Sequence, residues 1–274
     1  MQVATTVLQA RALFDVLPRP IGFVPTMGAL HAGHLALAQR AREESMTVTA
    51  SIFVNPLQFA ANEDLDKYPR DLEGDRAKFA AAGVDVLFMP NQAIMYPPDF
   101  STSVDVGEMG SRYEGAVRPT HFRGVATVVS KLLNIVRPDA IYLGQKDAQQ
   151  TAVLRRMIGD LDIPTRVVIV PTEREADGLA MSSRNAYLNE RERQAAPTLH
   201  HALQALRMAM QMGKSKADAI AAARTRLDPL AELDYLDVVD ANTFVPIDVL
   251  TPPAFVIGAA RFGSTRLLDN LWIE

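Results

Sequence analysis

Short apolar segments alternate with helical patterns over the first 170 residues, and this alternation limits the possible folds more than any other feature of the chain. The apolar segments contain few polar positions, as expected of strands that are covered on both faces. Parallel strands need crossover connections, and helical crossovers cover the sheet. The pattern therefore predicts a doubly wound α/β sheet. The expected strands are residues 21–24, 48–54, 84–89, 140–143 and 166–170, and the expected helices between them are residues 35–44, 72–82, 124–136 and 148–161.

The pattern changes after about residue 171. Two helical patterns are followed there by three strand-like segments, which together suggest a small α+β domain. A chain of 274 residues is long enough for two domains, because single cores rarely grow to this size. We predict a Rossmann-like domain over residues 1–172 and a smaller C-terminal α+β domain over residues 173–274. The expected elements of the second domain are helices at 190–212 and 216–227 and strands at 235–239, 254–259 and 266–268.

Charge and composition narrow the class of function. The 28 basic and 32 acidic residues give a net charge of −4, so the chain lacks the basic excess that binding to a nucleic-acid backbone needs. The absence of cysteine excludes disulfides, thiolate zinc sites and cysteine nucleophiles. Residues 1–17 do not resemble a signal peptide, and no run of about 20 apolar residues occurs. We therefore expect a cytoplasmic protein that acts on small substrates, with no nucleic-acid or membrane partner.

Polar residues gather where four of the five expected strands end. Ligands of open α/β sheets bind beyond the carboxyl ends of the strands, where helix N-termini point N–H groups into the crevice. We therefore expect these groups to share one edge of the sheet. The segments that contain these groups, with their turn glycines and apolar neighbours, supply the candidate site residues. The candidates are Pro25, Thr26, Met27, Gly28, Ala29, Leu30, His31, Ala32, Gly33 and His34 after the first strand; Asn55 and Gln58 after the second; Gly144, Gln145, Lys146, Asp147 and Gln150 after the fourth; and Met181, Ser182, Ser183 and Arg184 beyond the fifth.

The segment after the first strand carries the most specific chemistry. Gly28 and Gly33 allow the backbone to approach a phosphate, and His31 and His34 lie on one side of a starting helix. Both imidazoles can donate hydrogen bonds to an α-phosphate that gains charge during an in-line displacement. The alternatives are a structural helix start or half of a metal site, although no third clustered ligand is evident. We favour binding of the ATP phosphates.

The other strand ends carry weaker individual signals. Lys146 supplies a point charge for phosphate oxygens, and Asp147 can cap the helix that follows. Residues 182–184 offer hydroxyls and a bidentate guanidinium for a leaving pyrophosphate. Each of these segments, taken alone, is also explained by a solvated turn.

Three further residues suit an organic acid as substrate. Gln58 and Gln150 are neutral donor–acceptor groups that suit a hydroxylated acid, although a single glutamine is usually exposed and has no role in function. Arg123 precedes an expected helix, where it can meet either a carboxylate or a phosphate. A surface arginine beside a helix cap explains Arg123 almost as well.

Five segments together resemble one family. A His-Ala-Gly-His turn after the first strand marks the nucleotidylyltransferase superfamily, which includes adenylyltransferases and class I aminoacyl-tRNA synthetases. In order and over nearly the whole chain, the sequence resembles the pantothenate synthetase family of that superfamily. The segments are PTMGALHAGH at 25–34, FVNPLQF at 53–59, HFRGV at 121–125, GQKDAQQ at 144–150 and GLAMSSRN at 178–185.

The resemblance implies a reaction and a set of roles. Pantoate and ATP would form pantoyl adenylate and pyrophosphate, and the amine of β-alanine would then displace AMP to give pantothenate. A homodimer is implied, as is Mg²⁺ carried largely by the nucleotide. By the family pattern His34 is the expected proton donor, acting with His31 and Lys146 as the catalytic set. The ATP contacts would come from residues 25–34, 144–147 and 181–184 and from Glu173; the substrate contacts from Gln58, Gln150, Asn55 and Arg123; and a metal contact from Asp75.

Two positions depart from the family pattern, and two other functions stay open. Gln145 stands where an acidic residue is common, and Glu173 occupies a place near the adenine that is usually apolar. One alternative is an adenylyltransferase that leaves a dinucleotide product. The other is a non-catalytic module that binds nucleotide or recognises tRNA, against which the acidic balance argues. In the favoured interpretation, the second domain closes over the site.

Overall fold

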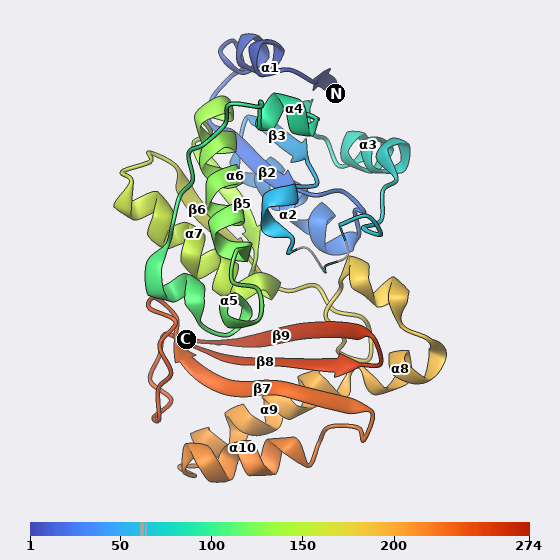
Figure 1. Ribbon diagram of the computed structural model, residues 1–274, viewed down its shortest axis with the longest axis vertical. Helices are drawn as coiled ribbons and strands as arrows, with labels where there is room; N and C mark the ends of the chain where they lie inside the picture. Colours follow the sequence, from blue (N-terminus) through green and yellow to red (C-terminus); the bar gives the residue numbers. More distant parts are fainter. Residues whose placement is uncertain (61–62, 64) are drawn as a thin grey trace. The chain divides into compact units, whose positions relative to one another are not determined.

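The computed structural model describes residues 1–60, 63 and 65–274, which form two compact units (Figure 1). The N-terminal unit comprises Met1–Gly144 and Val153–Val170, and the C-terminal unit comprises Gln145–Ala152 and Pro171–Glu274. The chain therefore enters the C-terminal unit twice. The second entry lies close to the boundary expected after residue 172, whereas the first has no counterpart in the sequence pattern.

The described part of the N-terminal unit contains a six-stranded sheet in the order β1-β4-β3-β2-β5-β6 (Figure 1). Every pair of neighbours runs parallel, which confirms the predicted doubly wound α/β sheet. The expected strands all form, with ends that differ by up to two residues. Their bounds are β1 Gln2–Ala4, β2 Ile21–Thr26, β3 Thr47–Ile52, β4 Val86–Phe88, β5 Ala140–Gly144 and β6 Arg166–Val170.

Helices cover both faces of this sheet. On β2, Ile21 and Phe23 pack into the core that α1, α6 and α7 complete, while Val24 packs on the opposite face against α2 and α3. Because successive side chains of a strand point to opposite faces of the sheet, β2 contributes residues to two separate cores. The helices are α1 Val7–Phe14, α2 Ala32–Glu44, α3 Leu72–Ala81, α4 Gln92–Met95, α5 Glu114–Val117, α6 His121–Val136 and α7 Ala148–Asp160, with 3-10 turns η1 Pro56–Gln58, η2 Gly107–Ser111 and η3 Gln145–Asp147.

The strand order reverses between β2 and β5. These strands are neighbours in the sheet, with Gly22 opposite Ala140, yet the chain continues from β2 toward β3 and from β5 toward β6. Ligands of doubly wound sheets bind at such a switch point, beyond the carboxyl ends of the strands. The segment of residues 25–34 starts at that end of β2.

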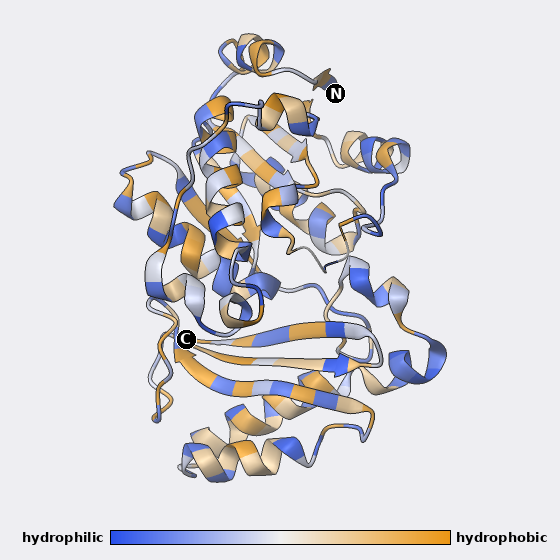
Figure 2. Cartoon of the chain, viewed as in Figure 1, coloured by the Kyte–Doolittle hydropathy of each residue, from blue (hydrophilic) through white to orange (hydrophobic). Residues whose placement is uncertain are grey.

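The described part of the C-terminal unit contains an antiparallel sheet of β7 Ala231–Asp240, β8 Ala254–Phe262 and β9 Thr265–Ile273. Helix α9 Thr198–Gln211 packs its apolar residues against one face of it, and α10 Lys216–Arg224 packs beside α9 and adds to the same core (Figure 1). Helix α8 Glu190–Ala195, by contrast, is mostly hydrophilic (Figure 2), and only Ala195 at its end joins this core. The 3-10 turn η4 spans Ser183–Tyr187. This arrangement confirms the expected small α+β domain.

Two elements differ from the sequence-based expectation. Strand β1, which extends the edge of the first sheet beside β4, was not predicted, because three residues are too few to show a periodic pattern. The single helix expected over residues 190–212 is two helices, α8 and α9. Pro197 lies between them, where it lacks the N–H that a continuous helix would use. In the described part of the chain, no helix is both long enough and apolar enough to cross a membrane.

Candidate active site

The turn after β2 is held by a buried carboxylate. Gly28 and Ala29 have φ values of 85° and 52°, and Asp75 of α3 accepts hydrogen bonds from the N–H groups of Ala29 and Leu30, both at 2.8 Å. A Cβ atom on residue 28 would lie 2.9 Å from Asp75 Oδ2. Glycine is therefore needed at position 28 for its backbone angle and for the close approach of Asp75. Lys78 completes the contact by donating to the carbonyl of Leu30 at 2.9 Å.

His31 and His34 form a capping pair at the start of α2. The Nδ1 of His31 accepts from the N–H of Gly33 at 3.2 Å, and the Nδ1 of His34 accepts from the N–H of His31 at 3.4 Å. The two ring centroids are 4.1 Å apart. A nitrogen that accepts a hydrogen bond carries no proton, so Nε2 is the protonated nitrogen in each ring. Both imidazoles thus combine a helix-capping role with an N–H donor on the ring edge opposite Nδ1.

Several backbone N–H groups of this segment are engaged within the protein. The N–H groups of Ala29, Leu30, His31 and Gly33 all have acceptors within the protein. These four N–H groups stabilise the turn and the start of α2. Binding of the ATP phosphates by this segment stays a prediction.

Gln58 is buried in a chain of amide contacts. Its Oε1 accepts from Asn55 Nδ2 at 3.0 Å, and its Nε2 donates to Met27 Sδ at 3.0 Å, so the orientation of the amide is determined by its neighbours. Asn55 is fully buried, and Asn55 Nδ2 also donates to the carbonyl of Gly124 at 3.1 Å. The structure thus brings Gln58 beside Met27 and gives Asn55, a predicted substrate contact, the role of orienting Gln58.

Tyr96 supports Asn55 and was not predicted. Its hydroxyl donates to Asn55 Oδ1 at 2.8 Å. Burial raises the pKa of Tyr96, so the phenol stays protonated and remains a donor. Sequence reasoning missed Tyr96 because it precedes a proline-rich segment far from any motif.

Arg118 and His121 hold the backbone at Gln58. Arg118 Nη2 lies 3.1 Å from the carbonyl oxygen of Gln58, and His121 Nδ1 lies 3.0 Å from the same oxygen. Glu63 pairs with Arg118, whose Nε donates to Glu63 Oε1 at 2.7 Å. The position of Gln58 therefore depends on α5 and α6 as well as on η1. The sequence signal for this contact was the HFRGV segment at 121–125, which contains His121.

Arg123 lies elsewhere on the N-terminal unit. Its side chain is 57% exposed, and its Nε is 3.6 Å from the equally exposed Asp105. Because both groups are solvated, this ion pair adds little stability. In the described part of this unit, Arg123 pairs with Asp105 and not with the predicted site residues, so its role as a substrate ligand stays a prediction.

Asp75, the predicted metal contact, is a buried anchor in this structure. Its side chain is 1% exposed, and both oxygens already accept backbone hydrogen bonds. Nor does the described part of the chain contain any group of three or more His, Asp or Glu side chains that could hold a metal ion. A cavity of about 240 Å³, lined by Met27, Gly28, Asp75 and Arg70 among others, lies beside the turn.

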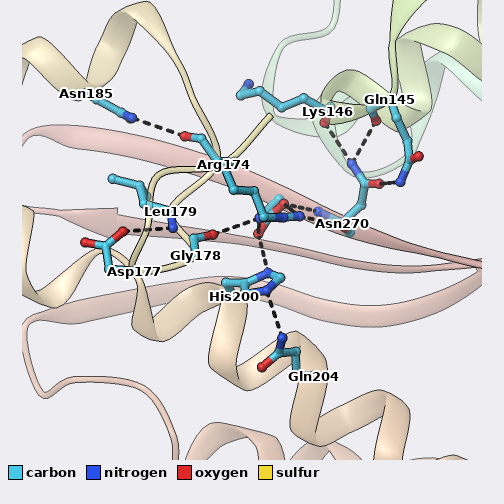
Figure 3. Close-up of polar contacts among 12 residues, drawn as sticks. Gln145, Lys146, Arg174, Asp177, Gly178, Leu179, Asn185, His200, Gln204 and Asn270 are labelled. Carbon is cyan, nitrogen blue, oxygen red and sulfur yellow. Dashed lines mark hydrogen bonds and ion pairs between the residues drawn. The ribbon is translucent and has the colours of Figure 1, made fainter. Parts of the chain in front are cut away.

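The Lys146 turn belongs to the C-terminal unit. Figure 3 shows Asn270 of β9 pointing at this turn, where Asn270 Nδ2 donates to the carbonyls of Gln145 and Lys146, both at 2.9 Å. The Gln145 amide donates in turn to Asn270 Oδ1 at 3.3 Å. Lys146 Nζ lies 3.3 Å from Asp147 Oδ1, so Asp147 pairs with the lysine. Gln150 follows one turn later on α7 and is half-buried.

The loop with Ser182, Ser183 and Arg184 begins as a narrow antiparallel turn. Arg174 pairs with Ala180 across it, and the N–H of Met181 donates to the carbonyl of Glu173 at 2.9 Å. Ser182 then caps η4 by accepting from the N–H of Arg184 at 3.2 Å. The backbone of Glu173 thus fixes Met181, while the Glu173 residue as a whole is exposed.

The family model of pantoate-beta-alanine ligase matches residues 2–272 of this chain. The chain belongs to the pantoate-beta-alanine ligase family. Members of this family are ATP-dependent ligases, and the sequence-based expectation of fold and function is confirmed at that level.

Named relatives and solved structures agree with the family. The pantothenate synthetase of Roseiflexus castenholzii is 50% identical over the full length of both chains, and that of Rhizorhabdus wittichii is 52% identical over 93% of this chain and 91% of its own. The crystal structure of pantothenate synthetase from Thermus thermophilus superposes with a TM-score of 0.95 at 50% identity, covering 99% of each chain. The pantoate-beta-alanine ligase of Francisella tularensis, complexed with beta-gamma ATP and β-alanine, has a TM-score of 0.82 at 33% identity, covering 99% of this chain and 97% of its own.

Proposed function

We propose that this pantoate-beta-alanine ligase family member works through a pantoyl adenylate. A carboxylate oxygen of pantoate attacks the α-phosphorus of ATP, and the bond to the β-phosphate oxygen breaks to release pyrophosphate. The amine of β-alanine then attacks the acyl carbon, loses a proton and expels AMP. The first step is needed because a carboxylate is a poor electrophile, whereas the adenylate carries a good leaving group.

The observation that carries the proposal is the His31–His34 pair. Each Nδ1 is occupied as an acceptor from the backbone, so each Nε2 is an N–H donor held in place before any ligand binds. Donors that are already oriented stabilise developing charge without reorganisation. We assign the two Nε2 atoms to the oxygens of the transferring phosphate. Lys146 supplies a point charge for phosphate oxygens, and Ser182, Ser183 and Arg184 bind the leaving pyrophosphate.

The substrates bind through groups that the fold orients. Gln58, held by Asn55 and Met27, meets pantoate and then β-alanine, and Gln150 meets pantoate. Mg²⁺ would arrive with the ATP phosphates, whose charge it neutralises. A homodimer and a cytoplasmic location belong to the same proposal and follow from the family resemblance.

The adenylate is tested by exchange of labelled pyrophosphate into ATP with pantoate present and β-alanine absent. We expect exchange that depends on pantoate, and free AMP with pantothenate once β-alanine is added. His34→Ala should slow the exchange about 100- to 1000-fold, the cost of removing one preorganised donor. His201→Ala is the control, since His201 is an exposed histidine on α9. Pantoate-independent exchange, or unchanged exchange in His34→Ala, would contradict the proposal.

A further inference from the structure

Strand β9 carries two adjacent buried polar residues. Asp269 is 5% exposed and Asn270 is 2% exposed, in a strand whose Leu267, Leu271 and Ile273 pack into the core of the C-terminal unit. Burying a carboxylate and an amide is unfavourable unless all of their polar atoms are paired. Their partners therefore show what these two residues hold in place.

Asn270 uses its whole amide on the Lys146 turn. Both hydrogens of Nδ2 go to consecutive carbonyls, those of Gln145 and Lys146, and Oδ1 accepts from Gln145 (Figure 3). Three hydrogen bonds from one buried side chain determine the path of the backbone at residues 145–146. They thereby determine where the Lys146 side chain starts.

Asp269 holds the loop that leads to Ser182. Arg174 donates two parallel hydrogen bonds to its carboxylate, at 2.7 and 2.9 Å, and His200 Nδ1 lies 3.2 Å from Asp269 Oδ2. Arg174 also donates to the carbonyls of Gly178 and Asn270, at 3.0 and 3.1 Å. Figure 3 shows His200 placed between this cluster and Gln204, whose Nε2 lies 2.9 Å from His200 Nε2. Arg174 thus links the turn that precedes Ser182 to β9, because it binds Asp269 and the carbonyl of Gly178 together.

We propose that Asp269 and Asn270 are positioning residues of the reaction. Together they fix the position of the Lys146 turn relative to the Ser182–Arg184 loop, because both segments are bound to the same strand. The proposal rests on the phosphate-binding roles assigned above to Lys146 and to Ser182, Ser183 and Arg184. Since both segments are fastened to neighbouring residues of one rigid strand, the lysine and the loop keep a constant separation within this unit. Neither Asp269 nor Asn270 touches the reacting atoms in this proposal.

A double-mutant cycle tests the Asn270 half of the proposal. Asn270→Leu removes all three hydrogen bonds at similar volume, and pantoate-dependent ATP–pyrophosphate exchange should fall about 10- to 100-fold, because a small displacement of a catalytic group has effects of that size. In the Lys146→Ala background the same change should alter the residual exchange less than about threefold, because a misplaced lysine and a missing lysine are equivalent. Asn134→Leu is the control, since Asn134 donates to the carbonyl of Ser130 on α6.

Each outcome of this cycle has a defined meaning. An equal loss in both backgrounds would show a general structural effect, and no loss when Lys146 is intact would show that Asn270 has no effect on the reaction; either result overturns the proposal. If Lys146→Ala alone leaves exchange unchanged, the phosphate role of Lys146 fails, and this inference fails with it. If Asn270→Leu does not fold, Asn270→Ser replaces it in the double-mutant cycle. Serine is polar, and its side chain is too short to reach both carbonyls.

Arg174→Lys tests the Asp269 half. Lysine keeps a positive charge opposite the buried carboxylate but cannot make the paired hydrogen bonds to Asp269. We expect a rise of about tenfold or more in the KM for ATP, and little further rise when Arg174→Lys is added to Arg184→Ala. Arg156→Lys, at an exposed ion pair on α7, is the control and should leave KM unchanged. An unchanged KM in Arg174→Lys would overturn this half of the proposal.

Discussion

Single residues in this protein often have a structural role where their type suggests a chemical one. Asp75 and Asn55 are polar residues beside the candidate site, yet each uses its oxygens on neighbouring protein groups. In the proposed mechanism His31 and His34 do both, because an imidazole has one nitrogen for the cap and another that can contact a ligand. A residue with two separable polar atoms can thus serve the fold and the reaction together.

Asp75→Asn separates the anchoring role from a metal-binding role. An amide has a single acceptor oxygen, so one backbone N–H of the turn would face the new NH₂ group. We expect a loss of about 2 to 3 kcal/mol in the free energy of unfolding, the scale of a hydrogen bond to a charged group. Urea unfolding measures this loss, and Asp71→Asn, an exposed cap on the same helix, should change it by less than about 0.5 kcal/mol.

The Mg²⁺ dependence of ATP–pyrophosphate exchange provides the second readout for Asp75→Asn. A structural anchor predicts slower exchange with an unchanged Mg²⁺ midpoint. A shifted midpoint with unaltered unfolding would instead favour a metal ligand.

At the scale of elements, β9 connects the small sheet to the two segments of its unit that we assign to phosphate binding. Asp269 is the centre of that connection. Burial alone would raise the pKa of Asp269, but hydrogen bonds from His200 and Arg174 outweigh it and hold the pKa below the usual 3.8. A carboxylate whose pKa is lowered by folding stabilises the fold above its unfolded pKa, and this contribution is lost as the pH falls through the folded pKa.

Asp269→Asn should therefore remove a stabilisation that depends on pH. At pH 7 the variant should unfold at lower urea concentration than the parent protein, because the half-buried Arg174 loses its charged partner. Below about pH 4 the two midpoints should converge as Asp269 becomes protonated in the parent. Urea titrations at several pH values check this, and midpoints that differ by a constant amount down to about pH 2 would contradict it.

At the scale of the whole molecule, each unit has its own core, and the chain passes between the units at residues 144–145, 152–153 and 170–171. Residues 145–152 begin immediately after β5 but belong to the C-terminal unit, with Asn270 bonded to Gln145 and Lys146. Because residues 145–152 join the C-terminal unit, the lysine that we assign to the phosphate is positioned by Asn270, which lies 124 residues away in the sequence.

The separate cores predict separate responses to mutation. Asp269→Asn should speed amide hydrogen exchange about tenfold or more in β7, β8 and β9 and much less in β2 and β5, and Asp75→Asn should do the reverse. Because the two sites share no partner, their effects on unfolding should add within about 0.5 kcal/mol. Hydrogen exchange followed by mass spectrometry makes the comparison. Equal acceleration in both sheets by either variant would show that the two units unfold as one.

Much of the architecture follows from the sequence alone. Apolar runs and helical periods predict all the parallel strands except β1, because a strand buried on both faces must be almost wholly apolar. The position of the His31–His34 turn after β2 likewise follows from local patterns, since glycines and a helix start are short-range signals. The five motifs together identify the family.

Only the tertiary structure decides which polar groups pair with each other. Asp75 meets a turn 45 residues before it, Tyr96 supports Asn55, and Asn270 reaches back to Gln145. None of these pairings leaves a period or a motif in the sequence, because hydrogen bonds between distant segments depend on how the segments pack. The sequence thus determined the elements and the chemical groups, and the packing determined which of those groups hold one another in place.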